Sequence, residues 1–249
     1  MENLDELLNQ FQGKHLLAIF AHPDDESFVS AGLLQVAKYY HLKTTLLCLT
    51  RGGKGRNSLE KGKLVEIRSK ELDNARVILS IDKVILRDYP DASLVETKKD
   101  WVGEVKNIID SEKPDIIVTF DFSGLTGHPD HIVSALEVFN IVKEMKTKPI
   151  LFWRVPSEKE KRYFRAKEAY SYTVHPNYTL RFGISEALKK IQAVFAHRSQ
   201  MQSLIFKLRF IWLFLSSHQE TYFLVDTKRH YPYRFVSFKI DDNFTFYPG

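Results

Sequence analysis

Short apolar runs alternate with longer amphipathic stretches over the first 155 residues of the chain. Runs of this kind are typical of strands buried on both faces, and they predict strands at residues 16–21, 44–49, 84–86, 115–120 and 149–153. Apolar residues at helical spacing predict helices between them, at residues 27–40, 60–80, 94–113 and 131–144. This alternation predicts an α/β fold: a doubly wound, mostly parallel Rossmann-like sheet flanked by helices.

The pattern weakens after residue 155. A charge-rich stretch at 158–168 precedes a mainly helical region at 184–215, and further strands are predicted at residues 221–226, 233–240 and 243–247. No glycine- or serine-rich linker and no internal repeat divides the chain. We therefore expect one domain over residues 1–249, with a core at about 14–155 and a C-terminal α+β extension at about 156–249 that packs on the sheet.

A first polar cluster lies where the first predicted strand ends. Residues 16–21 are all apolar, and the segment 22–26 (HPDDE) follows directly. Polar groups at the carboxyl ends of parallel strands form the ligand sites of open α/β sheets. His22 and Asp25 are three residues apart across a tight turn, so both can reach one metal ion, whereas Asp24 points elsewhere and is free to move protons. The alternative interpretation is that the proline and the acids simply begin a helix.

A second cluster, residues 128–131 (HPDH), follows the fourth predicted strand and opens a helix. In a doubly wound sheet the first strand usually neighbours the strand at which the order reverses, here the fourth, so the two clusters would face one crevice. His22, Asp25 and one histidine of the second cluster would supply three protein ligands and leave an open position for water, as catalytic zinc sites require. The spacing leaves open whether that histidine is His128 or His131.

Composition narrows the remaining classes of function. The chain is 44% hydrophobic, which is unlike a disordered chain. Its net charge of +5 is only mildly basic, and nucleic-acid binding, which rests on this charge and the basic loop at 51–57 alone, is not expected. Cys48 is the only cysteine, which favours a reducing, cytoplasmic location. No apolar run is long enough for a signal sequence or a membrane span. The apolar segment 204–215 is expected in the core or at a homo-oligomer interface, in preference to a membrane surface.

These motifs resemble those of one enzyme family. The segment 21–26 (AHPDDE), followed by 128–131 (HPDH), is similar to the motif pair of the PIG-L/LmbE-like family of zinc-dependent N-acetylglucosaminyl deacetylases. Residues 68–71 (RSKE) and 196–200 (AHRSQ) are also similar to family patterns, and the resemblance covers about residues 14–140. Since the chain lacks the N-terminal spanning helix of the membrane-anchored eukaryotic members, we expect an enzyme of the soluble, microbial type.

The resemblance implies a role for each side chain of the two clusters. The implied zinc ligands are His22, Asp25 and His131. Asp24 would be the general base, and His128, protonated and oriented by Asp130, would stabilise the oxyanion. This arrangement suits amide hydrolysis, which needs a nucleophile at neutral pH, an oxyanion stabiliser and a proton for the leaving amine.

The resemblance also implies substrate contacts and a substrate class. Arg68 would hold sugar hydroxyls, Asp91 would do the same, and His197 is either a pocket residue or a buried hydrogen-bonding residue. The expected substrate is a small N-acetylglucosamine (GlcNAc) conjugate or glycan fragment. The expected metal is zinc, with ferrous iron, Fe(II), or another divalent ion as alternatives. A metal-dependent hydrolase of another amide or of a phosphoester on the same scaffold is the rival interpretation.

Overall fold

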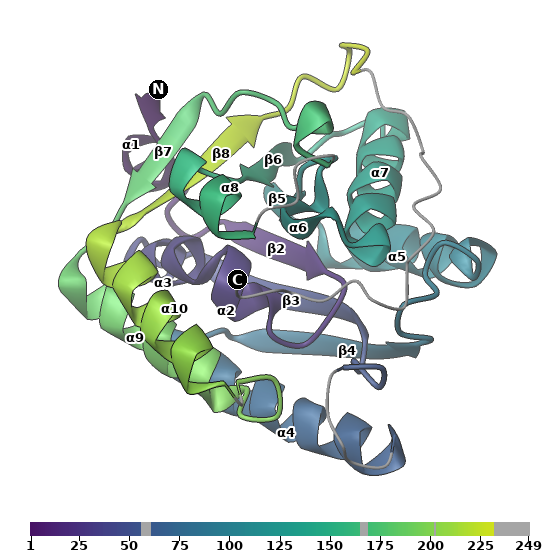
Figure 1. Ribbon diagram of the computed structural model, residues 1–249. Helices are drawn as coiled ribbons and strands as arrows, with labels where there is room; N and C mark the ends of the chain where they lie inside the picture. The colour runs from purple at the N-terminus through teal and green to yellow at the C-terminus, as the bar shows by residue number, and fades with distance from the viewer. Residues whose placement is uncertain (56–60, 165–168, 202, 232–249) are drawn as a thin grey trace.

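The computed structural model describes residues 1–55, 61–164, 169–201 and 203–231, and across these residues one mixed sheet runs through the molecule with helices on both faces (Figure 1). The strands are β1 (Glu2–Asn3), β2 (His15–Phe20), β3 (Lys43–Thr50), β4 (Lys83–Tyr89), β5 (Ile116–Phe120), β6 (Ile150–Val155), β7 (Tyr178–Arg181) and β8 (Gln219–Leu224). The helices are α1 (Leu4–Asn9), α2 (Asp25–Val29), α3 (Ala31–Tyr39), α4 (Lys61–Leu79), α5 (Lys98–Glu112), α6 (Gly124–Gly127), α7 (Pro129–Glu144), α8 (Glu158–Phe164), α9 (Ile184–Ala196) and α10 (Leu204–Ser216), with a 3₁₀ turn at Ala169–Tyr172.

The strand order is β1-β7-β8-β6-β5-β2-β3-β4, and β2 lies between β3 and β5 with both pairings parallel. The chain runs outward from β2 through β3 to β4, then returns to the other side of β2 as β5 and continues to β6. The order therefore reverses between β2 and β5, the position where open α/β sheets bind ligands. This topology confirms the predicted doubly wound sheet, in which the first predicted strand neighbours the fourth.

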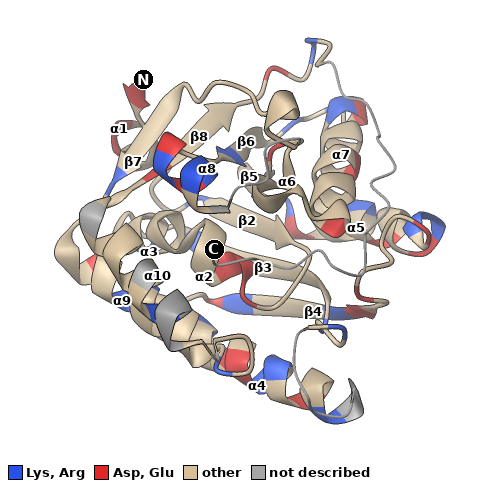
Figure 2. Cartoon of the chain, in the orientation of Figure 1, with Lys and Arg blue, Asp and Glu red and all other residues tan. Residues whose placement is uncertain are grey.

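The two strands at the reversal point are completely buried. Neither β2 nor β5 carries a Lys, Arg, Asp or Glu residue (Figure 2). Because helices cover both faces of the sheet here, apolar side chains are needed on both sides of each strand, and the two sequences read as nearly continuous apolar runs. Phe20 and Phe120, the last residues of the two strands, make an edge-to-face contact with ring centroids 5.0 Å apart. This contact fixes the ends of β2 and β5 next to each other. The two histidine clusters follow these strand ends.

Helices α2, α3, α4 and α9 cover one face of the sheet, and α5 and α7 cover the other (Figure 1). The helix predicted at 27–40 is in fact two helices, α2 and α3, separated at Ser30, whose φ of −139° is not helical. The physical reason is a tertiary contact. The Glu220 carboxylate accepts the backbone N–H groups of Gly32 at 2.9 Å and Leu33 at 3.0 Å, so a second helix begins at this point.

The C-terminal part extends the sheet instead of only packing on it. β8 pairs antiparallel with β6, β7 pairs antiparallel with β8, and β1 adds to the edge of β7. The strand predicted at 221–226 is β8, whereas those predicted at 233–240 and 243–247 lie outside the described residues. β1 and β7 were not predicted because they are only two and four residues long. A buried ion pair between Lys190 of α9 and Glu220 of β8, with Nζ and Oε1 2.6 Å apart, ties the extension together.

The apolar segment at 204–215 forms helix α10. It is 13 residues long, and among the described residues no helix combines the length and the apolar character needed to cross a bilayer. Phe210, Leu213 and Phe214 pack inward in a cluster that includes residues of α9. Trp212, on another side of α10, is 67% exposed. Among the α10 side chains that the structure describes, some meet the expected burial and others are exposed, and the homo-oligomer interface stays a prediction.

Candidate functional site

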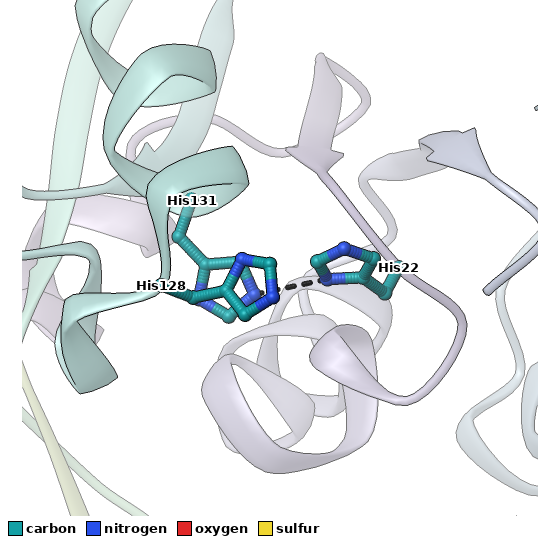
Figure 3. A group of neighbouring side chains, drawn as sticks. All are labelled: His22, His128 and His131. Carbon is teal, nitrogen blue, oxygen red and sulfur yellow. Dashed lines mark hydrogen bonds between the residues drawn. The ribbon is translucent and has the colours of Figure 1, made fainter. Parts of the chain in front are cut away.

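The two histidine clusters lie side by side at the carboxyl ends of β2 and β5 (Figure 3). After β2 the chain turns through His22 and enters α2, and after β5 it passes through α6 and enters α7. His128 is the N-cap of α7 and Pro129 is its first residue, which places His131 in the first turn, facing His22. The local sequence therefore turns three imidazole rings toward one another.

Three side chains that could bind a metal come close together between these elements. His22 Nδ1 and His131 Nε2 are 3.1 Å apart. The Asp25 carboxylate lies 3.3 Å from His131 Nε2 through Oδ1 and 3.7 Å from His22 Nδ1 through Oδ2. Ligands at about 2.0–2.2 Å from a tetrahedral zinc ion lie roughly 3.3 Å from one another. Each pair of these side chains is therefore separated by about the distance expected between two ligands of one metal ion, with a different Asp25 oxygen facing each histidine.

The hydrogen bonds around the two rings direct one nitrogen of each ring toward the other. The Nδ1 atom of His131 lies 2.9 Å from the Gly124 carbonyl oxygen, to which it donates, so in the neutral ring Nε2 is the nitrogen that can bind a metal. The Nε2 atom of His22 lies 3.2 Å from Asp130 Oδ2 and 3.1 Å from Asp91 Oδ1, so it donates there, and the other ring nitrogen, Nδ1, faces His131. Two ring nitrogens 3.1 Å apart need either a shared proton, as in a hydrogen bond, or a metal ion between them. This donor set fits a divalent metal ion.

The carboxylates around the His22 and His131 rings also favour a positive charge between these rings. Burial lowers the pKa of His22, but hydrogen bonds to the carboxylates of Asp130 and Asp91 raise it well above its ordinary value. Burial raises the pKa of Asp25, but the His131 imidazole beside it brings that pKa down to about 2. The acids therefore stay ionised and stabilise a cation, whether a proton or a metal ion.

Two further combinations of side chains share His22. His22, His128 and His131 offer ligand atoms within 4.8 Å of one another, and so do His22, Asp91 and Asp130. Asp91 and Asp130 both face Nε2 of His22, on the side opposite to Nδ1, where they orient the ring. His128 packs edge-to-face on His22 with ring centroids 4.7 Å apart. The structure thus contains a candidate metal site, and His22 is common to every combination found among the described residues.

Asp24 is the most accessible of three consecutive acids. Its side chain is 18% exposed, against 6% for Asp25 and 0% for Glu26. Its φ of 112° is a left-handed conformation that residues other than glycine rarely adopt. Burial raises the pKa of Asp24 to about 6, although the nearby Arg68 guanidinium opposes that rise. A carboxyl group with this pKa beside the candidate metal site is suited to accept and return a proton.

The contact between His128 and Asp130 differs from the one that the resemblance implies. The Asp130 carboxylate is used elsewhere: it accepts the backbone N–H groups of Ala92 at 2.8 Å and Leu94 at 3.0 Å, and it faces His22. The backbone N–H of Asp130 donates to His128 Nδ1 at 3.2 Å, which leaves the ring proton on Nε2. Burial lowers the pKa of His128 to about 3, and the neighbouring imidazoles add to the effect. His128 is therefore a neutral hydrogen-bond donor.

Arg68 and Asp91, predicted to hold sugar hydroxyls, bond to other residues of the site. The Arg68 guanidinium is almost completely buried; it donates to the Pro23 carbonyl oxygen, and its Nη2 lies 3.1 Å from Asp24 Oδ2. Burial raises the pKa of Asp91, but the hydrogen bond with His22 lowers it well below its usual range. In this structure Arg68 holds Asp24, and Asp91 orients His22.

His197, for which the sequence left two roles open, is completely buried. Its Nε2 atom donates to Glu26 Oε1 at 2.8 Å, which favours the role of a buried hydrogen-bonding residue. The two supporting motifs meet nearby, because Ser199 donates to the Glu71 carboxylate through both its backbone N–H and its hydroxyl, each at 2.7 Å. The Glu26–His197 and Glu71–Ser199 pairs join positions 171 and 128 residues apart, so no local pattern reveals them.

Comparisons with known proteins give a family for the chain. The family model described as PIG-L, GlcNAc-PI de-N-acetylase, matches residues 17–142. A relative from Bacillus anthracis, named probable N-acetyl-alpha-D-glucosaminyl L-malate deacetylase 2, is 26% identical over 204 residues, which cover 79% of this chain and 85% of the relative.

Solved structures share the fold. The N,N'-diacetylchitobiose deacetylase from Pyrococcus horikoshii is similar with a TM-score of 0.67 at 18% identity, over 92% of this chain and 95% of that chain. GalB, a 4-carboxy-2-hydroxymuconate hydratase from Pseudomonas putida, is similar with a TM-score of 0.64 at 15% identity, over 86% and 96% of the two chains. The fold therefore supports more than one reaction. Because the family match spans half of the chain and both histidine clusters, the protein belongs to the PIG-L family.

Proposed function

We propose that this protein is a metal-dependent hydrolase that removes the acetyl group from a GlcNAc-containing conjugate. The observation that carries the proposal is the convergence of His22 Nδ1, His131 Nε2 and the Asp25 carboxylate within 3.1–3.7 Å, beside the partly exposed carboxyl group of Asp24. Family membership supports the same reaction, since the family is described as a de-N-acetylase and the Bacillus anthracis relative is named as a deacetylase.

His22, Asp25 and His131 would hold the metal, with zinc as the expected ion and Fe(II) or another divalent ion as alternatives. When bound, the metal supplies Lewis acidity, which polarises the acetamide carbonyl and lowers the pKa of the attacking water. Asp130 and Asp91 would keep His22 in the tautomer that presents Nδ1. The chain's own residues then carry the proton transfers and stabilise the developing charge.

Asp24 would be the general base. A pKa of about 6 leaves the carboxyl group mostly ionised at neutral pH and still able to carry a proton during turnover. The carboxylate takes a proton from the attacking water and returns it to the amine nitrogen as the carbon–nitrogen bond breaks. Arg68, 3.1 Å from the same carboxylate, favours its ionised form and restricts its orientation.

His128 would stabilise the negative charge that develops on the acetamide oxygen. Its Nδ1 accepts the Asp130 backbone N–H, so the neutral ring presents Nε2–H as a donor. A neutral, preorganised donor can fill this role without the protonated imidazolium expected from the sequence.

The second candidate function is hydrolysis of another amide or of a phosphoester. The group formed by His22, Asp91 and Asp130 favours a second ion, and metal-dependent phosphoesterases usually hold two metals about 3.5–4 Å apart. One metal ion per chain, together with acetate release, would exclude a two-metal phosphoesterase.

We expect the zinc-loaded enzyme to release equal amounts of acetate and free amine from a GlcNAc conjugate. The panel would contain malate and inositol conjugates and diacetylchitobiose, which are the substrates in the names of similar proteins. Chelation should abolish release because the Lewis acid is lost, and added zinc should restore it. The same conjugates without the acetyl group are the controls. Phosphate release from a phosphoester, with no acetate from any conjugate, would contradict the proposal.

A further inference from the structure

Behind Asp24 lies a series of buried hydrogen bonds that the proposed reaction does not use. Glu26 Oε2 accepts the backbone N–H of Asp24 at 3.0 Å. Glu26 Oε1 accepts from His197 Nε2 at 2.8 Å and from the Ser27 hydroxyl at 2.6 Å. Glu26 and His197 are both fully buried, so neither touches a substrate. The hydrogen bond from the Asp24 N–H to Glu26 connects this pair to the proposed general base.

The Asp24 backbone needs this support. Asp24 is the N-cap of α2, yet its φ and ψ of 112° and −25° are left-handed, and its side chain makes no capping hydrogen bond. An aspartate at an N-cap ordinarily has an extended backbone and turns its carboxylate back onto the first N–H groups of the helix. The unusual conformation costs free energy, and it leaves the carboxylate available for Arg68 and for the candidate metal site.

We propose that Glu26 and His197 are positioning residues, which hold the Asp24 backbone in its left-handed conformation and thereby aim its carboxylate at the attacking water. This inference rests on the proposed role of Asp24 as general base. The Glu26 carboxylate holds the Asp24 N–H, and the His197 imidazole holds the Glu26 carboxylate. Because His197 directly follows α9, the C-terminal extension is joined to the general base.

Helix α4 closes the network from the other side. Arg68 binds the Asp24 carboxylate, and one turn later Glu71 accepts both donors of Ser199, two residues after His197. One helix therefore holds Asp24 and also the turn that carries His197. The two supporting motifs lie far from the metal ligands in the sequence. In the structure both help to hold Asp24 in place.

Glu26→Gln tests the inference because it keeps the shape of the side chain and replaces one acceptor with a donor. The amide NH₂ group cannot accept a hydrogen bond, so the side chain can no longer accept from both the Asp24 N–H and the His197 Nε2–H. We expect kcat to fall about 10–100-fold because the base is misplaced, while KM and metal content change less than about twofold. His197→Phe should lower kcat similarly, and His197→Gln, which keeps a donor, should recover part of the loss.

A double-mutant cycle separates positioning from a merely structural role. In an Asp24→Asn background, Glu26→Gln should cause no further loss of kcat, because the group that it positions is already gone. Equal losses in both backgrounds would overturn the inference. Lys190→Met is the matched control: it breaks another buried ion pair of the extension, with Glu220, and should lower Tm without changing kcat of the folded enzyme.

The crystal structure of Glu26→Leu, whose side chain accepts no hydrogen bond, supplies a readout that does not depend on activity. We expect Asp24 to leave its left-handed conformation while His22 and His131 stay in place. A φ that stays near 112° would overturn the inference. If the wild-type enzyme released no acetate from any conjugate, the proposed function would fail, and this structural result would still decide whether Glu26 holds the Asp24 backbone.

Discussion

Asp24→Asn is expected to lower kcat about 10²–10⁴-fold while the metal content and the fold stay unchanged. Asparagine has nearly the same shape and tolerates the left-handed conformation, so the backbone at φ 112° is preserved. The amide oxygen can still accept from Arg68, which lies 3.1 Å from Asp24 Oδ2. The variant lacks the carboxylate, which is the group that can take the proton of the attacking water and return it to the amine.

The measurement is kcat and KM for acetate release, with metal content determined on the same samples. Asp110→Asn is the matched control, because Asp110 lies on the exposed surface of α5, paired with Lys106. This variant should be indistinguishable from wild type. A near wild-type rate for Asp24→Asn would show that Asp24 is not the general base.

His131→Ala is expected to lose the metal and all measurable turnover, whereas His128→Ala keeps the metal. His131 Nε2 lies 3.1 Å from His22 Nδ1 and 3.3 Å from Asp25 Oδ1. Removing it should weaken metal binding by more than the roughly 10–100-fold that loss of an outer-shell partner costs. His128→Ala should lower kcat about 10²–10³-fold, as expected for the loss of one oxyanion donor.

Metal content after dialysis against a metal-free buffer distinguishes the two histidines. Because the His131 ring also stacks on Phe120 with centroids 4.1 Å apart, thermal unfolding of both metal-free variants must be recorded to separate metal loss from misfolding. A folded His131→Ala protein that retains the metal, or a His128→Ala protein that loses it, would reverse the ligand assignment.

The parts of the structure that rest on local patterns were predictable. The continuous apolar runs at 16–21 and 115–120 require burial on both faces, and short strand–helix alternation leads to a doubly wound sheet. The topological rule then places the two strand ends beside each other, and with them His22 and His131. The meeting of the two clusters therefore followed from the sequence without any knowledge of side-chain contacts.

The partners of individual polar groups were not predictable, because they depend on contacts between distant segments. The Asp130 carboxylate takes the backbone N–H groups of residues 92 and 94 and the His22 ring, not the His128 ring two positions away. The break between α2 and α3 depends on Glu220, 188 residues beyond Gly32. In both cases a long-range hydrogen bond outweighs the local pattern.

Diffraction data collected at the zinc absorption edge from zinc-loaded crystals would locate the ion itself. We predict one anomalous peak about 2.0–2.2 Å from His22 Nδ1, His131 Nε2 and an oxygen of Asp25. A peak bonded to His22 Nε2, Asp91 and Asp130, or no peak beside His22 at all, would contradict the proposed site.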